Sequence, residues 1–276
     1  INTATHFGLE RELGSIAPGR RADVIFTSDL TALPINRVMA RGKTVALNGE
    51  VLTDCPHVVW PEVARRTVRI GADKIATEFM VAAPHGADAV VVRVIGVIEN
   101  QAPTKALEAT LPVRDGCVIA QGDNCHVSLV ERHRARGSVS NAFVSGFGYE
   151  GNMAIASTVA HDSHHMIVVG TCPENMALAA NRLAEVGGGV TVWNDGVEQA
   201  LVELPIAGLM SDAPAITVAT KAEQIVQAMA DCGCTLNNAY MQHSLLALVV
   251  IPELRISDLG LVDVTRFEIT PVLKDV

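Results

Sequence analysis

The densest group of reactive side chains in this 276-residue chain is the run His161-Asp162-Ser163-His164-His165. Imidazole and carboxylate groups are good ligands for divalent transition metals, and histidine is the usual acid/base group near neutral pH. The run lies between two apolar segments, so we expect it at the end of a strand or in a connecting loop. It predicts His161, Asp162 and His164 as auxiliary catalytic residues, with His161 and His164 as candidate ligands of an additional metal.

Two other interpretations of this run stay open. Asp162 and Ser163 could turn or cap the chain while the histidines form hydrogen bonds within a domain interface. Alternatively, residues 161–165 could centre an autonomous metal-binding or hydrolytic domain. A metal site usually takes at least three protein ligands, however, and the helical zincin spacing is absent. His126, Glu131 and His133 are further candidates whose positions spacing alone does not fix.

Two other motifs do not favour catalysis. Ser145 lies in Val-Ser-Gly-Phe-Gly, which is not the Gly-x-Ser-x-Gly order of a nucleophile elbow. Cys232-Gly233-Cys234 is too tight for a zinc knuckle and lacks a second pair at the usual spacing. The six cysteines lack the density of a secreted disulfide framework, which favours a reducing cytoplasm.

The composition narrows the classes of partner. A hydrophobic content of 49% with 18% charged residues describes a globular chain. The net charge of −9, without a basic stripe, argues against nucleic acid, and a small neutral ligand fits better. No apolar stretch reaches the roughly 18 residues that cross a bilayer, so we expect no membrane partner.

The first part of the chain predicts a small antiparallel β unit. Residues 22–26, 37–41, 43–46 and 50–52 are short β-prone runs, and Asn48-Gly49 is a tight-turn signal before the last of them. Prolines in the segment from Cys55 to Glu62 indicate a connector. We therefore expect a helix end over residues 1–12, a β-sandwich-type unit over residues 13–70, and a domain boundary near residue 70.

The remainder, residues 71–276, predicts a larger α/β domain, so that the whole chain is α+β. Residues 89–98, 127–132 and 166–170 are predicted strands, and Asp115-Gly116 predicts a hairpin. Helices are predicted over residues 173–186, ended by three glycines, and over residues 221–230. Gly137, Gly146, Gly148 and Gly151 are interpreted as tight turns rather than a phosphate loop.

Several longer motifs carry a family resemblance. The segment from Gly14 to Ile25, Gly-Ser-Ile-Ala-Pro-Gly-Arg-Arg-Ala-Asp-Val-Ile, looks like the strand that follows the catalytic barrel in amidohydrolases. Further motifs follow in order at residues 130–133, 143–148, 156–164, 204–212, 251–254 and 260–264. Together they resemble the C-terminal part of bacterial adenine deaminases, and the resemblance covers essentially the whole chain. His165 and the Ala135-Arg136-Gly137 segment depart from the family pattern.

This resemblance implies a function for a larger enzyme. Family members hydrolyse adenine to hypoxanthine and ammonia with a divalent two-metal centre, manganese or iron, in a (β/α)8 barrel. Their ligands include a His-x-His pair, and no His-x-His occurs in residues 1–276. The resemblance therefore implies a portion without the catalytic barrel, except for its tail at residues 1–12.

The same resemblance implies partners. They are adenine as the substrate of the complete enzyme, the missing barrel, and further copies in a homo-oligomer. We expect the 276-residue chain alone to be inactive. The alternative is a non-catalytic structural or oligomerisation module, in which the histidine run only rigidifies an interface.

Overall fold

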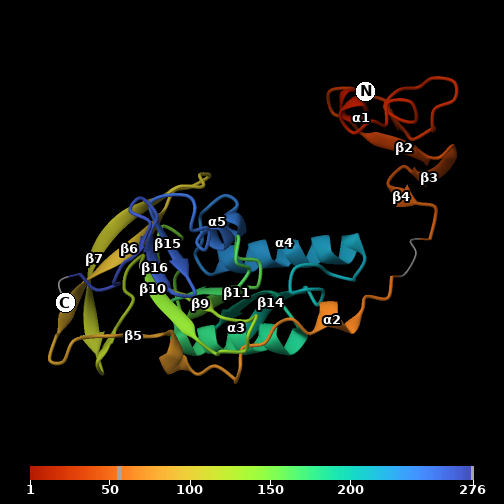
Figure 1. The fold of residues 1–276 in the computed structure, drawn as a ribbon. Coiled ribbons are helices and arrows are strands. Elements are labelled where there is room, and N and C mark those ends of the chain that lie inside the picture. Colours follow the sequence, from red (N-terminus) through yellow and green to blue (C-terminus); the bar gives the residue numbers. More distant parts are fainter. Residues whose placement is uncertain (55–57, 275–276) are drawn as a thin grey trace. The chain divides into compact units, whose positions relative to one another are not determined.

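The computed structural model describes residues 1–54 and 58–274, which form two compact units, Ile1–Val59 and Trp60–Val276 (Figure 1). The units divide earlier than the residue 70 expected from the sequence, because residues 60–70 already bond to the second unit. The Arg69 N–H donates to the Arg132 carbonyl at 2.9 Å, and the Ala207 N–H donates to the Ala64 carbonyl at 2.6 Å. Of the predicted connector, residues 55–57 lie outside the described residues, and α2 (Glu62–Arg65) begins directly after Pro61.

The first unit is a short helix and one antiparallel sheet. Helix α1 spans Asn2–His6, and the sheet has the order β1-β2-β3-β4. Its strands are β1 (Val24–Thr27), β2 (Ile35–Ala40), β3 (Lys43–Leu47) and β4 (Glu50–Val51). The tight turn predicted at Asn48-Gly49 is confirmed, with φ of 49° and 87°. Among its described residues only Ala4 is buried, so this unit has almost no core of its own.

The second unit is built on one large sheet of ten strands, in the order β14-β13-β11-β12-β9-β10-β6-β7-β8-β5. The pair β10 and β6 is parallel, and the other neighbouring pairs are antiparallel. The strands are β5 (Val81–Ala82), β6 (Ala89–Val97), β7 (Thr104–Arg114), β8 (Cys117–Val118), β9 (Cys125–Val130), β10 (Val139–Ser145), β11 (Met153–Ser157), β12 (Met166–Gly170), β13 (Gly189–Asn194) and β14 (Val197–Glu203). The order is open at β14 and β5, so the sheet does not close into a barrel.

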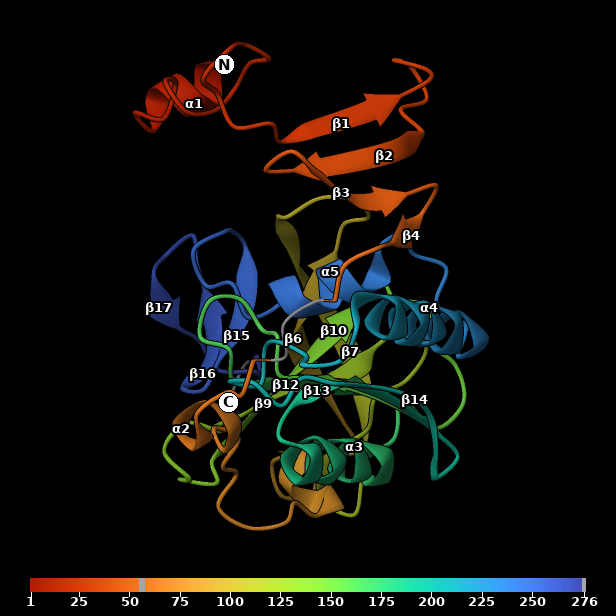
Figure 2. The ribbon, with the colours of Figure 1, turned by 90° about the vertical axis from the view of Figure 1, so that its right-hand side faces the viewer.

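Helices cover both faces of the central strands. Alternate residues of β11 point to opposite faces, so Ile155 packs in one core cluster and Ala154 in another. The first cluster includes residues of α4 (Ala215–Asp231), and the second is built on α3 (Pro173–Val186). Figure 2 shows these two helices on opposite sides of the sheet. Strand β12 is buried along its whole length, which explains its continuous apolar run.

The remaining elements of the second unit are short. They are η1 (Ala76–Phe79), α5 (Ala239–Leu245), and a three-stranded sheet of β15 (Leu254–Ser257), β16 (Gly260–Asp263) and β17 (Glu268–Ile269). No helix among the described residues is long and apolar enough to cross a membrane.

The predicted α+β class is confirmed, together with most of the predicted elements. The helix at residues 173–186 has the predicted bounds, and Gly187 ends it at φ 85°. Helix α4 begins at Ala215 rather than near residue 221, because Pro214 starts it and the β-branched residues of its first turns hide its helical period. The Asp115-Gly116 hairpin and the strand at residues 89–98 also form.

Candidate functional site

The histidine run lies in the tight connection between β11 and β12, as the sequence predicted. The backbone holds this turn at two points: the His161 N–H donates to the Ser244 carbonyl at 3.1 Å, and the His164 N–H to the Ala160 carbonyl at 2.6 Å. His164 has a left-handed φ of 49°, which reverses the chain immediately before β12. Hydrogen bonds to the backbone of the turn therefore position these histidines.

The structure divides the histidines into two pairs. The rings of His161 and His164 meet edge to face with centroids 5.8 Å apart. His165 is buried, and its ring centroid lies 4.6 Å from that of His133. Asp162 is exposed, so its carboxylate is not part of a closed group with the two imidazoles.

A buried arginine lies behind the turn. The Arg132 side chain donates from Nε to the His164 carbonyl at 2.5 Å and from Nη2 to the Ala207 carbonyl at 3.2 Å. Its Nη1 has no hydrogen-bond partner among the described residues. Burial lowers the pKa of Arg132 to about 10, which still leaves it cationic at neutral pH. A fixed positive charge thus lies next to the His164 backbone.

This environment favours the neutral form of His164 and His165. Burial lowers the pKa of His164, and the nearby His161 and Arg132 lower it further. Burial also lowers the pKa of His165, although Asp258, whose Oδ2 lies 3.7 Å from the His165 Nε2, opposes the shift. The Nδ1 atoms of both rings are buried without a hydrogen-bond partner in the described part of the chain. Neutral imidazoles can accept or relay a proton near pH 7.

A polar cavity of about 430 Å³ opens beside the second pair of histidines. It is lined by Glu131, His133, Arg134, Arg136, His165 and Asp258. The Glu131 carboxylate accepts backbone N–H groups of His133 at 2.6 Å, Arg134 at 2.7 Å and Arg136 at 2.9 Å. Burial acts to raise the pKa of Glu131, but these hydrogen bonds outweigh it, so the pKa falls below its ordinary value.

The cluster does not supply a complete metal site. Within residues 1–54 and 58–274, no three His, Cys, Asp or Glu side chains come together in an arrangement that could hold a metal ion. His161 and His164 therefore have no third ligand of these types. The family resemblance places its two-metal centre in the barrel, so these residues do not test it, whereas the autonomous metal-binding interpretation gains no support from the described residues.

The structure also shows which candidates belong together. His133 and Glu131, whose positions sequence spacing did not fix, line the same cavity as His165. His126 lies elsewhere: it is buried in β9 and packs against Phe143 of β10. Arg132 and Asp258 were missed. Arg132 comes shortly after the end of a buried strand, which is a usable signal in the sequence. Asp258 comes from a distant hairpin, and no spacing rule predicts its approach to His165.

A family model matches most of the second unit. Residues 101–268, which include the histidine turn and the cavity, match the family model described as "Adenine deaminase C-terminal domain". The chain belongs to this family. The adenine deaminase C-terminal domain thus covers most of the second unit, from the end of β6 to β17.

Curated relatives extend the similarity to almost the whole chain. Adenine deaminase of Ruegeria sp. (strain TM1040) is 71% identical over 274 residues, which are 99% of this chain and 46% of the relative. Adenine deaminase of Moorella thermoacetica is 44% identical over 275 residues, again 99% of this chain and 46% of the relative. The adenine deaminase domain and its preceding β unit thus span about half the length of the curated relatives they match.

Proposed function

We propose that this chain is the C-terminal portion of an enzyme that hydrolyses adenine to hypoxanthine and ammonia. The observation that carries the proposal is the 71% identity over 99% of the chain to a protein named adenine deaminase. In this proposal residues 1–12 end a catalytic barrel and the β unit packs beside that barrel. In this proposal the barrel carries the divalent metal centre, manganese or iron, as the resemblance to adenine deaminases implies.

The histidine turn is proposed to assist catalysis rather than to perform it. His161 and His164 are paired, and burial together with neighbouring charge keeps His164 neutral. A neutral imidazole near a reacting purine can take up or deliver a proton. Burial lowers the pKa of His164 and the charge of the exposed Asp162 opposes this shift, so the Asp162 carboxylate would stabilise the His164 ring once it is protonated. We also propose a cytoplasmic homo-oligomer as the working form of the complete enzyme.

The test is a comparison of the 276-residue chain with the longer protein that includes the proposed barrel. Each is purified, incubated with adenine and manganese or iron, and assayed chromatographically for hypoxanthine. We expect turnover by the longer protein and none above a blank by the chain alone, because positioning without an activated nucleophile leaves most of the barrier in place. Turnover by the chain alone would place the catalytic groups within it and overturn the proposal.

A longer protein that binds metal but does not convert adenine would contradict the proposed reaction. It would favour the alternative of a structural module, in which the β unit and the adenine deaminase C-terminal domain serve assembly. The exposed apolar side chains of the first unit are the observation that supports this alternative.

A further inference from the structure

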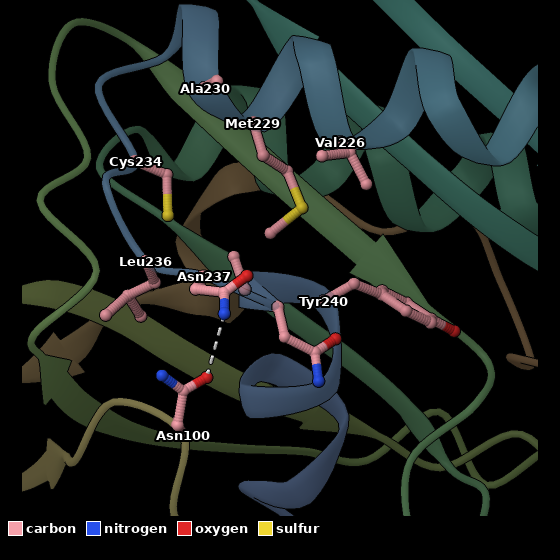
Figure 3. Close-up of a pocket in the computed structure, with 10 residues that line it drawn as sticks. Asn100, Val226, Met229, Ala230, Cys234, Leu236, Asn237 and Tyr240 are labelled. Carbon is pink, nitrogen blue, oxygen red and sulfur yellow. Dashed lines mark hydrogen bonds between the residues drawn. The ribbon is translucent and has the colours of Figure 1, made fainter. Parts of the chain in front are cut away.

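A separate cavity of about 550 Å³ lies beside the C-terminal end of α4. Figure 3 shows Val226 and Met229 of α4 on one side of it, with Leu236 and Asn237 facing them. Sites for small molecules usually measure roughly 300–1,000 Å³ and are lined mainly by apolar groups with a few polar ones. This cavity has the size and character of such a site, and none of its lining residues belongs to the histidine turn.

The lining carries no charged side chain. Cys234 and Tyr240 close opposite ends of the cavity in Figure 3, and burial raises the pKa of each, so both are neutral near pH 7. A charged ligand would lose its hydration here without gaining a counter-charge. The occupant that fits this lining is therefore uncharged.

Three asparagines line the cavity. At two of these positions the backbone conformation accounts for the choice of asparagine. Asn100 and Asn238 both have φ of 58°, a left-handed conformation that asparagine tolerates better than most residues. Asn237 has no such positive φ, and it is an exposed residue that lines the cavity. The side chain of Asn237 is therefore accessible to a ligand in the cavity.

Two hydrogen bonds hold Asn237 in place, and part of the hydrogen-bonding capacity of its side chain has no partner in the described chain. Its Nδ2 donates to the Asn100 Oδ1 at 3.4 Å, as drawn in Figure 3, and its backbone N–H donates to the Glu99 carboxylate at 2.9 Å. Among the hydrogen bonds within residues 1–54 and 58–274, this leaves the Asn237 Oδ1 and one Nδ2 hydrogen for another partner. A carboxamide offering one acceptor and one donor side by side pairs with an amino-nitrogen edge such as that of adenine.

The walls favour a flat ligand. Met229 places a thioether on one side, and sulfur makes favourable contacts with aromatic rings. Leu236 offers an apolar surface on the other side, and Asn237 offers hydrogen bonds at the edge. We propose that this cavity binds an uncharged planar nitrogen heterocycle about the size of a purine base. This proposal does not depend on the catalytic function proposed above.

Isothermal titration calorimetry on the 276-residue chain tests the proposal, with adenine, hypoxanthine and anionic orotate as probes. We expect saturable binding of adenine or hypoxanthine with a Kd below about 1 mM. Orotate should bind at least tenfold more weakly, because the cavity has no cation to match its carboxylate. If neither base binds saturably, or if orotate binds as well as they do, the proposal is wrong.

Three variants locate the site. Val226→Trp should fill the cavity and weaken binding at least tenfold, whereas Gln227→Trp, on the exposed surface of the same helix, should not change it. Asn237→Leu should weaken binding similarly, and it also separates this cavity from a neighbouring one of about 360 Å³ that shares Val226 but not Asn237. Circular dichroism checks that each variant folds. Unchanged binding in a folded Val226→Trp or Asn237→Leu variant would overturn the proposal.

Discussion

The backbone of His164 is held by hydrogen bonds, whereas its imidazole ring makes few contacts that stabilise the fold. Its backbone accepts from Arg132 and donates to Ala160, while its Nδ1 is buried without a partner in the described chain. A buried polar atom without a hydrogen-bond partner is uncommon in native proteins, and a catalytic role is one explanation for it. Removal of the His164 ring should therefore affect chemistry more than stability.

At this scale we predict the effect of His161→Ala and His164→Ala in the complete enzyme. Each should lower turnover of adenine at least about tenfold, a barrier rise of about 1.4 kcal/mol, and leave the melting temperature nearly unchanged. His85→Ala, at an exposed histidine elsewhere in the chain, is the matched control and should alter neither. If both variants lose stability and keep their turnover per folded molecule, the histidine turn is structural.

At the scale of elements, the three glycines after α3 permit a very close chain crossing. Gly187 ends the helix with φ 85°, and Gly188 follows with φ 116°. A Cβ on Gly188 would lie 2.5 Å from the Gly208 Cα and 3.0 Å from the Thr158 Oγ1. Thr158 itself donates to the Gly208 carbonyl at 2.6 Å and accepts the Gly189 N–H at 2.8 Å. This crossing joins α3, β13 and the segment that supports Arg132.

We therefore predict that Gly188→Ala lowers the free energy of unfolding by at least about 3 kcal/mol, because backbone strain and a backbone clash act together. Gly196→Ala, just beyond the other end of β13, is the matched control. Gly196 has φ 78°, and no atom lies within 4 Å of the position that a Cβ would take there. Strain alone should therefore cost about 1 kcal/mol at this control position. Urea unfolding of both variants measures the difference, and equal losses would show that the crossing is not tight.

At the scale of the whole molecule, the two units differ in how they bury apolar surface. The second unit has continuous core clusters on both faces of its large sheet. The first unit exposes large apolar side chains, among them Ile16 at 88% and Leu30 at 84%. This unit has almost no core, so these side chains gain burial only through association with another surface. The first unit therefore has the surface expected of an element that packs against another part of a larger protein.

We predict that the 276-residue chain binds a hydrophobic dye and self-associates at high concentration. Replacing Ile16 and Leu30 by serine should reduce both effects, whereas Ile216→Ser, at a residue that is 75% exposed on the second unit, should not. Dye fluorescence and light scattering after size exclusion provide the measurements. A monodisperse monomer that binds no dye would contradict the expected packing role.

Most of the local structure and the family membership could be predicted from the residues alone. Some features depend only on residues close together in the chain, so they were predictable. They are the continuous apolar run of β12, the helical period of α3, and the turns at Asn48-Gly49 and Asp115-Gly116. The sequence also placed the histidines in a loop, because polar residues between two apolar strands have few other positions. Only the tertiary structure paired His165 with His133 and Asp258, and only it placed Asn237 opposite Met229 across a cavity. Those contacts join segments far apart in the chain, and their approach depends on how the whole sheet and its helices pack rather than on any local pattern.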